Sequence, residues 1–400
     1  MSPASKILGT IVVFLIIVVG MLFWRETTYG SPPAVVGDAA SLTAREVAVV
    51  ANAVEGTVSI VDLQSMEIAK TINVIPDGSK ATFFRDPSQS ILQPIVERKG
   101  GLNFAQDTDL SPDGRTLFVS RGFLGDVIAV DIGSSQIVWR TPIKGVRADH
   151  MDISPDGKKL YVSGLIYSND MVQIIDTKTG RITGAFKAGR WPHDVHAASD
   201  GKRLHVASLG NMTIGEDERG AEEHAYEITE VDAQTLRVLR RHAFDAGVRP
   251  FALSADKSTV FAQLSNTHAV VKRDLTTGND IARIDLPVED GVTQDDWDFE
   301  APHHGLALTK DEKRLCIAGR ASDYAAILQA DDLSLEAAVD VGDAPSWAVI
   351  ASDDRTCILA NNRSDDVSFV DLETGKETKR LDVGRGPKHI TVGRVSVPLN

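Results

Sequence analysis

Residues 154–162 read Ser-Pro-Asp-Gly-Lys-Lys-Leu-Tyr-Val, which is a polar turn followed directly by an apolar strand. Similar turns occur six times, and their aspartates are separated by 43, 44, 56, 55 and 42 residues. These aspartates are Asp113, Asp156, Asp200, Asp256, Asp311 and Asp353. A period near 43 residues with two longer members is typical of a repeat array that carries insertions.

Each repeat has the same internal pattern. An apolar stretch precedes the turn, and three short strands follow it, such as 160–163, 172–176 and 182–186. Four short antiparallel strands make up one blade of a β-propeller. The three later strands occur seven times, whereas the strand before the turn occurs six times and once more at 387–392. The sequence therefore predicts an all-β, seven-bladed β-propeller over 44–400.

The C-terminal strand is expected to join the first blade and close the ring. Closure leaves no long exposed sheet edge, so we expect a monomeric propeller. The formal charge of −14 argues against nucleic acid as a partner, because a field of that sign repels phosphate backbones. Phosphate-cradling loops, a Gly-x-Ser-x-Gly nucleophile elbow and Cys-x-x-Cys motifs are absent from the sequence.

An uncharged apolar run at 8–24 precedes the repeats. Its 17 residues would cover about 25 Å as a helix, the short end of a bilayer span. Lys6 precedes the run, so the sequence predicts a cytoplasmic segment at 1–7, a transmembrane signal anchor at 8–24 and a tether at 25–43. The propeller would then be held at the cell membrane on its extracytoplasmic (periplasmic) side. A cleaved signal peptide is the alternative, although no small-x-small cleavage site follows closely.

Two cysteines, Cys316 and Cys357, occupy what aligns as the same place in neighbouring repeats. Equivalent strands of adjacent blades usually lie too far apart for a disulfide bond. The sequence therefore predicts two buried core thiols in preference to a disulfide.

The repeat resembles that of the YVTN-repeat propellers, which include the YncE-like proteins. The resemblance covers about residues 45–395 and is carried by 51–62, 154–162 and 361–371, the last leading to Val-Gly-Arg-Gly-Pro at 383–387. It implies a propeller that is commonly exported, but it implies no single activity. Similar repeats occur in haem-d1 domains, methylamine dehydrogenase heavy chains, lactonases and lyases.

Three insertions lie in connections that share one face of a propeller, at 76–103, 210–225 and 287–301. Structureless loops of this length are more often functional than not, so we expect them around one mouth of the central channel. The residue pairs that open the inner strands at this mouth are Gln106-Asp107, Asp149-His150, His193-Asp194, Arg249-Pro250, His304-Gly305, Ser346-Trp347 and Lys388-His389.

Such a ring of imidazoles and carboxylates allows three kinds of site. His193, His304 and His389 are predicted to hold a divalent metal ion, which would polarise a substrate oxygen or activate water. Metal-free acid–base chemistry would use His193 or His304 against a carboxylate such as Asp149, so these three are the predicted catalytic residues. The third kind is ligand or cofactor binding, including axial ligation of a tetrapyrrole. A purely structural role, in which the imidazoles bond neighbouring blades, stays open as well.

The third insertion contains six acidic residues and two aromatic residues within 289–300. As a functional element it would be a lid that places Trp297 and Phe299 over the channel mouth. An acidic rim would favour neutral or cationic substrates. The predicted ligand-binding residues are Asp107, His150, Asp194, Arg249, Trp297, His303, Trp347, Lys388 and His389.

The sequence thus predicts a membrane-anchored, extracytoplasmic propeller that binds a small molecule, a metal or a protein partner at its channel mouth. A metal-assisted hydrolase or lyase is one alternative. A haem-d1 or electron-transfer accessory protein is the other.

Overall fold

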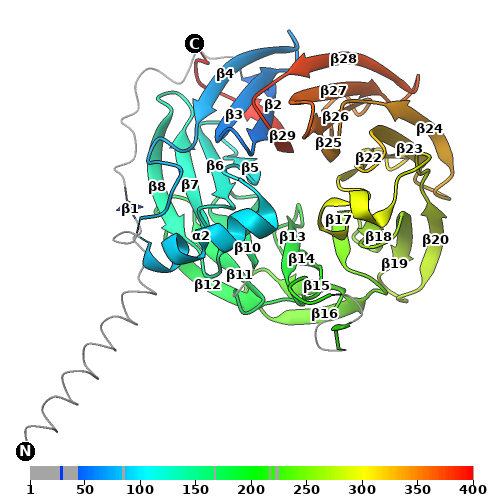
Figure 1. The fold of residues 1–400 in the computed structure, drawn as a ribbon, viewed down its shortest axis with the longest axis horizontal. Helices are drawn as coiled ribbons and strands as arrows, with labels where there is room; N and C mark the ends of the chain where they lie inside the picture. The colour runs from blue at the N-terminus through cyan, green and yellow to red at the C-terminus, as the bar shows by residue number, and fades with distance from the viewer. Residues whose placement is uncertain are drawn as a thin grey trace, which may run out of the picture.

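The computed structural model describes residues 28–29, 44–82, 86–165, 168–215, 218–220 and 225–399. These residues form seven antiparallel sheets arranged as the blades of a ring (Figure 1). Six sheets have four strands, and the sheet of blade 2 has a fifth. The prediction of a seven-bladed, all-β propeller is confirmed.

The first four blades are built from successive segments of the chain, except that blade 1 takes its inner strand from the C-terminus. Blade 1 contains β29 (Pro387–Val395), β2 (Arg45–Asn52), β3 (Thr57–Asp62) and β4 (Glu67–Asn73). Blade 2 contains β5 (Asp107–Leu110), β6 (Thr116–Arg121), β7 (Asp126–Asp131), β8 (Gln136–Pro142) and the added β1 (Thr28–Tyr29). Blade 3 contains β9 (Arg147–Ile153), β10 (Lys159–Leu165), β11 (Met171–Asp176) and β12 (Ile182–Lys187). Blade 4 contains β13 (Pro192–Ala197), β14 (Arg203–Ser208), β15 (Glu227–Asp232) and β16 (Val238–Ala243).

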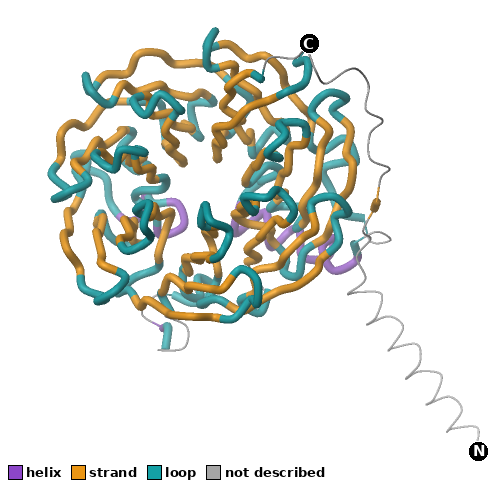
Figure 2. Tube along the Cα trace, turned by 180° about the vertical axis from the view of Figure 1, so that it is seen from behind, coloured by secondary structure: helices purple, strands orange, loops and turns teal. Residues whose placement is uncertain are grey.

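The remaining three blades follow the same order. Blade 5 contains β17 (Val248–Leu253), β18 (Thr259–Leu264), β19 (Ala269–Asp274) and β20 (Asp280–Asp285). Blade 6 contains β21 (Leu306–Leu308), β22 (Arg314–Gly319), β23 (Tyr324–Gln329) and β24 (Leu335–Asp340). Blade 7 contains β25 (Pro345–Ile350), β26 (Thr356–Asn361), β27 (Asp366–Asp371) and β28 (Lys376–Asp382). The inner strands, such as β5, β13, β25 and β29, lie nearest the centre of the ring in Figure 1, and Figure 2 shows the same ring from behind.

The repeated turn owes its sequence to hydrogen bonds. In the second copy, the Ser154 hydroxyl donates to Asp156 Oδ1 at 2.7 Å and accepts the backbone N–H of Lys159 at 2.9 Å. Asp156 also accepts the N–H of Lys158, and Gly157 adopts a φ of 70° that disfavours a side chain. The serine, aspartate and glycine of the turn are therefore set by local backbone geometry, which explains why the turn identifies the repeat.

The ring closes as predicted, because β29 pairs with β2 along its length, from Asn52↔Pro387 to Arg45↔Val395. Alternate side chains of β2 are buried on both faces. Val47 and Val49 pack in the core shared with blade 2, whereas Ala48 packs in the core shared with blade 7. Because each blade is covered on both faces, its middle strands read as continuous apolar runs.

The first insertion forms helix α2 (Pro87–Gly100) rather than the structureless loop that we expected. The Gln89 side-chain amide donates to the carbonyls of Phe123, at 2.8 Å, and Val146, at 2.9 Å. The Asp86 carboxylate at the start of the helix forms an ion pair with Arg140 at 2.6 Å. These bonds hold α2 on the face of the ring that is turned toward the viewer in Figure 1.

The second and third insertions meet on that same face. The third contains two short 3-10 helices, η2 (Gln294–Asp296) and η3 (Asp298–Glu300). Arg219, in the described part of the second insertion, is buried and forms an ion pair with Glu300 at 2.5 Å. This ion pair connects the acidic third insertion to the second insertion.

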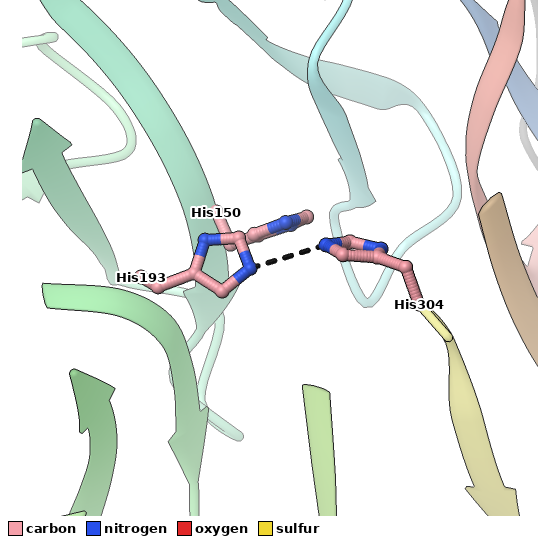
Figure 3. Close-up of side chains that lie close together, drawn as sticks. All are labelled: His150, His193 and His304. Carbon is pink, nitrogen blue, oxygen red and sulfur yellow. Dashed lines mark hydrogen bonds between the residues drawn. The ribbon is translucent and has the colours of Figure 1, made fainter. Parts of the chain in front are cut away.

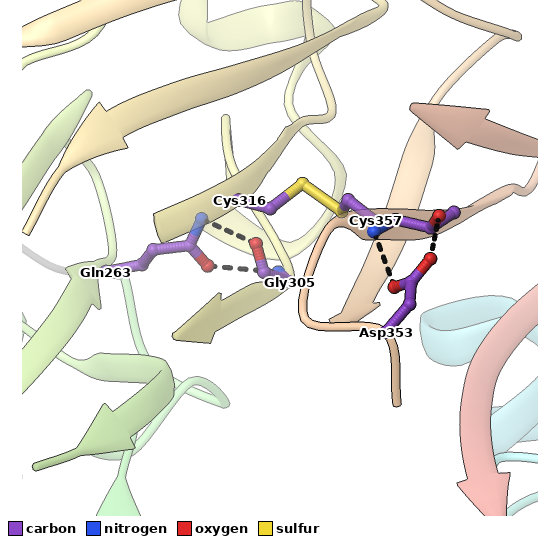
Figure 4. Close-up of a disulfide and its surroundings, with 6 residues drawn as sticks. Gln263, Gly305, Cys316, Asp353 and Cys357 are labelled. Atoms are coloured by element: carbon purple, nitrogen blue, oxygen red, sulfur yellow. Dashed lines mark hydrogen bonds between the residues drawn. A yellow bond between two sulfur atoms is a disulfide. The ribbon is translucent and has the colours of Figure 1, made fainter. Parts of the chain in front are cut away.

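A disulfide bond joins Cys316 of β22 to Cys357 of β26, with Cα atoms 6.4 Å apart (Figure 4). The prediction of two free core thiols is wrong, because the two cysteines are offset by one residue. Cys316 is the third residue of its strand and Cys357 the second of the equivalent strand. Since side chains alternate between the faces of a strand, the offset turns the two sulfur atoms toward one another across the interface between blades 6 and 7. Both cysteines lie in the core between these blades.

The predicted anchor at 8–24 lies outside the described residues. Within the predicted tether, β1 pairs with β8 at Thr28↔Arg140 and Tyr29↔Trp139. Among the described residues, no helix has both the length and the apolar character needed to cross a bilayer.

Candidate metal centre at the channel mouth

The inner strands begin at the channel mouth with irregular pairing. The register shifts between Pro192 and Val195 on β13, and between Pro345 and Ala348 on β25. Shifts at equivalent points occur where β9, β17 and β29 pair with their neighbours. A bulge re-aims a side chain that a regular strand would turn away, and bulges are common at rims next to sites. The bulges fall on the residue pairs that the sequence singled out.

Three imidazoles from three blades converge at this mouth (Figure 3). His150 lies on β9 and His193 on β13, while His304 lies just before β21. One ligand atom of each ring lies within 4.8 Å of one ligand atom of the other two, and all three side chains are buried. The Nε2 atoms of His193 and His304 are 3.2 Å apart.

The Nδ1 atom of each ring contacts a group that can only accept a hydrogen bond. His193 Nδ1 is 2.6 Å from Asp149 Oδ2, and His150 Nδ1 is 3.0 Å from Asp107 Oδ2. His304 Nδ1 is 2.9 Å from the backbone carbonyl oxygen of Ser346. Each Nδ1 therefore carries the proton and donates it. In the neutral tautomer, Nε2 of every ring is left with a lone pair.

The two carboxylates are ionised despite their burial. Burial alone would raise the pKa of Asp149, but His193, His150 and Arg147 lower it to about 2. Burial likewise opposes ionisation of Asp107, yet His389 and His150 hold its pKa well below the usual range. Burial lowers the pKa of His193, and it lowers that of His304 further with help from the nearby His193. Burial alone would lower the pKa of His150, but its bond to Asp107 and the charge of Asp149 raise it.

A second layer lies next to the three imidazoles. The Asp107 carboxylate contacts His150 through Oδ2 and His389 Nδ1 through Oδ1, the latter at 2.8 Å. Trp347 stacks on the His150 ring at 4.8 Å between centroids, and lies 4.2 Å from the His389 ring. His389 was predicted as the third metal ligand, beside His193 and His304. In the structure, His150 takes that place, and His389 lies instead in a second group with Asp107 and His150.

A cavity with an empty volume of about 800 Å³ opens over His193 and His304. Four basic side chains line it, and two carboxylates oppose them. The basic residues are Arg147, Arg249, Arg320 and Lys388, and the acidic ones are Asp149 and Asp298. The lining is thus mainly basic although an acidic rim was expected, because the acidic residues of the third insertion are largely turned to solvent. Burial lowers the pKa of all four basic groups, to about 10 for Arg249.

Phe299 covers part of this cavity, whereas Trp297 does not line it. The Phe299 ring lies 6.0 Å from both the Arg147 guanidinium and the Lys388 ammonium. Trp297 packs edge-on against His268 at 5.1 Å between centroids. Of the two aromatic residues predicted for a lid, only Phe299 therefore reaches the channel mouth.

Besides Trp297, two more predicted ligand-binding residues lie away from the cavity. His303 points away from the mouth, with Nε2 at 2.9 Å from the Tyr324 hydroxyl. Asp194 turns toward the other end of the channel, where its carboxylate pairs with His196 at 3.0 Å. Arg249 and Lys388 line the cavity as expected.

Sequence reasoning missed Arg147 and Arg320. Arg147 stands two residues before Asp149 on β9. Residues two apart in a strand lie on the same face of the sheet, and this spacing could have identified Arg147. Arg320 follows β22 in a short turn, and nothing in its sequence context distinguishes it. Its guanidinium donates to Ser346 Oγ at 3.0 Å and pairs with Asp298 at 2.7 Å.

Comparisons with known proteins add little beyond the fold. Neither a protein-family model nor a curated protein matches the chain, so the YVTN-repeat resemblance stays a prediction. Among solved structures, the chain is similar to Kuenenia stuttgartiensis hydrazine synthase, at 21% sequence identity and a TM-score of 0.45. The match covers 67% of this chain and 95% of that chain. A likeness this distant carries no argument about function.

Proposed function

We propose that this protein is a membrane-anchored, extracytoplasmic propeller that binds one divalent transition metal ion through His150, His193 and His304. The bound metal faces the cavity at the channel mouth and acts on a small molecule held there.

The observation that carries this proposal is the contact between His193 and His304. Since both Nδ1 atoms donate to acceptors, two neutral rings would bring two lone pairs together 3.2 Å apart. Only a cation or an extra proton makes that approach favourable. Two imidazoles bound to a tetrahedral Zn²⁺ at about 2.0–2.1 Å would have nitrogens about 3.3 Å apart, close to the separation seen here.

The surroundings of the three rings match those of metal ligands. A metal-bound histidine usually donates its other ring N–H to a carboxylate or a backbone carbonyl, which fixes the ring and raises its basicity. Asp149, Asp107 and the carbonyl of Ser346 occupy these positions. Three protein ligands leave a fourth coordination position, as in catalytic rather than structural zinc sites.

The open position and the basic cavity favour a metal-assisted hydrolase or lyase as the more specific function. A bound metal ion would polarise a substrate oxygen or lower the pKa of a bound water molecule. Lys388 and Arg249 lie at the same cavity and would hold negative charge that develops on the substrate.

Two features support a location outside the cytoplasm. The uncharged run at 8–24 has the composition of a signal anchor. The Cys316–Cys357 disulfide suits an oxidising compartment, because such bonds are rare in cytosolic proteins.

Metal analysis after dialysis against Zn²⁺ tests the proposal. Wild-type protein should retain one zinc ion per chain, and His193→Ala should retain none. His389→Ala is the matched control. His389 is also a buried imidazole at the mouth, but its Nδ1 contacts Asp107, and it is not one of the three proposed ligands. Equal zinc retention by wild type and His193→Ala, or loss of zinc in His389→Ala alone, would refute the assignment.

A further inference from the structure

We infer that the cavity recognises a small organic anion that carries an apolar body. This inference deepens the proposed function by naming the class of ligand, and it therefore rests on that function. It is carried by the charge and shape of the cavity lining.

The basic side chains of the cavity outnumber the carboxylates, and both carboxylates are already engaged. Asp149 accepts hydrogen bonds from His193 and from Gln106. Asp298 pairs with Arg320, at 2.7 Å, and with Arg363, at 3.1 Å. Neither carboxylate forms an ion pair with Arg249 or Lys388.

The partners of Arg249 are neutral. Its Nε donates to the Ser265 hydroxyl at 2.8 Å, and its Nη2 donates to the Phe299 carbonyl oxygen. Lys388 lies beneath the Phe299 ring, and within the described residues its ammonium has neither an ion-pair partner nor a hydrogen bond. A buried charge is costly unless an opposite charge or strong hydrogen bonds compensate it. An anion in the cavity supplies that compensation.

The excess of positive charge is local. The chain as a whole has a formal charge of −14, so the field of the whole protein does not attract anions. A cluster of four basic residues on such a protein indicates a specific site. Arginine and lysine side chains bind carboxylate and phosphate groups through charge-assisted hydrogen bonds.

Apart from Gln106 and the imidazoles of His193 and His304, the rest of the lining is apolar. It consists of Leu165, Trp191, Leu209, Met212, Phe299 and Ala301. Ligand sites commonly combine a mostly apolar wall with a few polar groups that fix the orientation. The anionic group is therefore expected at Lys388 and Arg249, with the apolar body against the wall.

Titration calorimetry with four probes of similar size tests the inference. The anions are phenylacetate and phenyl phosphate, the neutral analogue is phenylacetamide, and the cation is phenethylamine. At least one anion should bind at least about tenfold more tightly than the amide, and the amine should bind most weakly. Which anion binds more tightly distinguishes a carboxylate from a phosphate ligand.

Two variants locate the anionic group. Lys388→Met should weaken binding of the preferred anion about tenfold or more and leave binding of the amide nearly unchanged. Lys272→Met is the matched control, since the Lys272 ammonium also lies over a phenylalanine ring, at 5.7 Å from Phe261, but donates to the carbonyl oxygen of Asp331 and does not line the cavity. Equal affinity for anion and amide, or an unchanged anion affinity in Lys388→Met, would overturn the inference.

The design keeps the two proposals separate. Zinc retention is measured in the same samples, and Lys388→Met should retain one zinc ion per chain. If wild-type protein retains no zinc, the metal proposal fails, and the four probes then test anion recognition on the metal-free protein. If zinc is retained but the anions show no preference, only the inference about the ligand fails.

Discussion

His303 and His304 are adjacent in the sequence, yet they lie in two different environments. His304 faces the channel, where its Nε2 meets that of His193 and its Nδ1 donates to a carbonyl. His303 faces outward into a cluster with His268 and Tyr324, at 5.1 Å from the His268 ring. Both are buried, so burial alone does not distinguish a metal ligand from a structural histidine.

The two clusters differ in charge and in the direction of their hydrogen bonds. The Tyr324 hydroxyl donates to the Pro287 carbonyl and so accepts the Nε2 proton of His303. Among the described residues, no carboxylate forms a hydrogen bond or ion pair with His303, and burial lowers its pKa to about 3. At the mouth, two ionised carboxylates and a carbonyl accept the Nδ1 protons of three rings, and the Nε2 atoms of His193 and His304 face one another at 3.2 Å. The arrangement of acceptors behind the rings therefore identifies the site.

The largest expected effect separates these neighbours directly. His304→Phe should abolish retention of zinc. Loss of the hydrogen-bond partner behind a ligand lowers metal affinity roughly 10–100-fold, and loss of the ligand itself should lower it further. His303→Phe, the matched change one residue away, should retain one zinc ion per chain. Zinc content after dialysis measures both, and loss of zinc in both variants would erase the distinction between the two clusters.

The second prediction concerns the stability of the scaffold, at the disulfide that joins blades 6 and 7. Reduction of the Cys316–Cys357 disulfide, which closes a loop of 41 residues, should lower the free energy of unfolding by about 4 kcal/mol. Denaturant unfolding with and without dithiothreitol measures this difference. Dithiothreitol should lower the stability of wild type and leave that of a Cys316→Ala, Cys357→Ala double variant unchanged.

The third prediction concerns the carboxylate behind a ligand. Asp149→Asn should weaken zinc affinity about 10–100-fold, because the amide no longer holds the protonated Nδ1 of His193 with a negative charge. Asp194→Asn, at a carboxylate that pairs with His196 instead, should leave the affinity unchanged. Competition with a chromophoric chelator reports both values. Equal affinities for the two variants would show that Asp149 does not support a ligand.

The smallest effect is expected lower in the channel, where a histidine pairs with a carboxylate without a metal. Burial would lower the pKa of His196, but Asp194 raises it to about 9. This raised pKa means that the pair stabilises the fold fully below about pH 6.5 and loses that contribution as pH rises through 9. His196 is 41% exposed, so the effect should not exceed about 1 kcal/mol.

The measurement is unfolding of wild type and His196→Gln across this pH range. The stability difference between them should shrink from pH 6 to pH 9.5. A difference that grows with pH would contradict the sign of the pKa shift.

The fold and part of the site were predictable from sequence because they depend on periodic patterns. The Asp156 turn, its repeats and the strand at 387–392 were enough to specify seven blades and their closure. The convergence of His193 and His304 followed from their equivalent positions in different blades. The anchor at 8–24 stays a prediction.

The remaining features depend on offsets of a single residue that no pattern reveals. Both His150 and His389 were expected at the mouth, but it is His150, at a bulge near the start of β9, that groups with His193 and His304. The disulfide forms because Cys357 is shifted by one position relative to Cys316. Arg320 reaches the cavity from a turn after β22, so only the folded chain shows that the lining is basic.

The most direct test is anomalous diffraction from crystals grown with Zn²⁺. The account predicts one anomalous peak at the channel mouth, about 2.0–2.1 Å from Nε2 of His150, His193 and His304. A mouth without such a peak, or a zinc ion bound to Asp107 and His389 instead, would contradict the central claim.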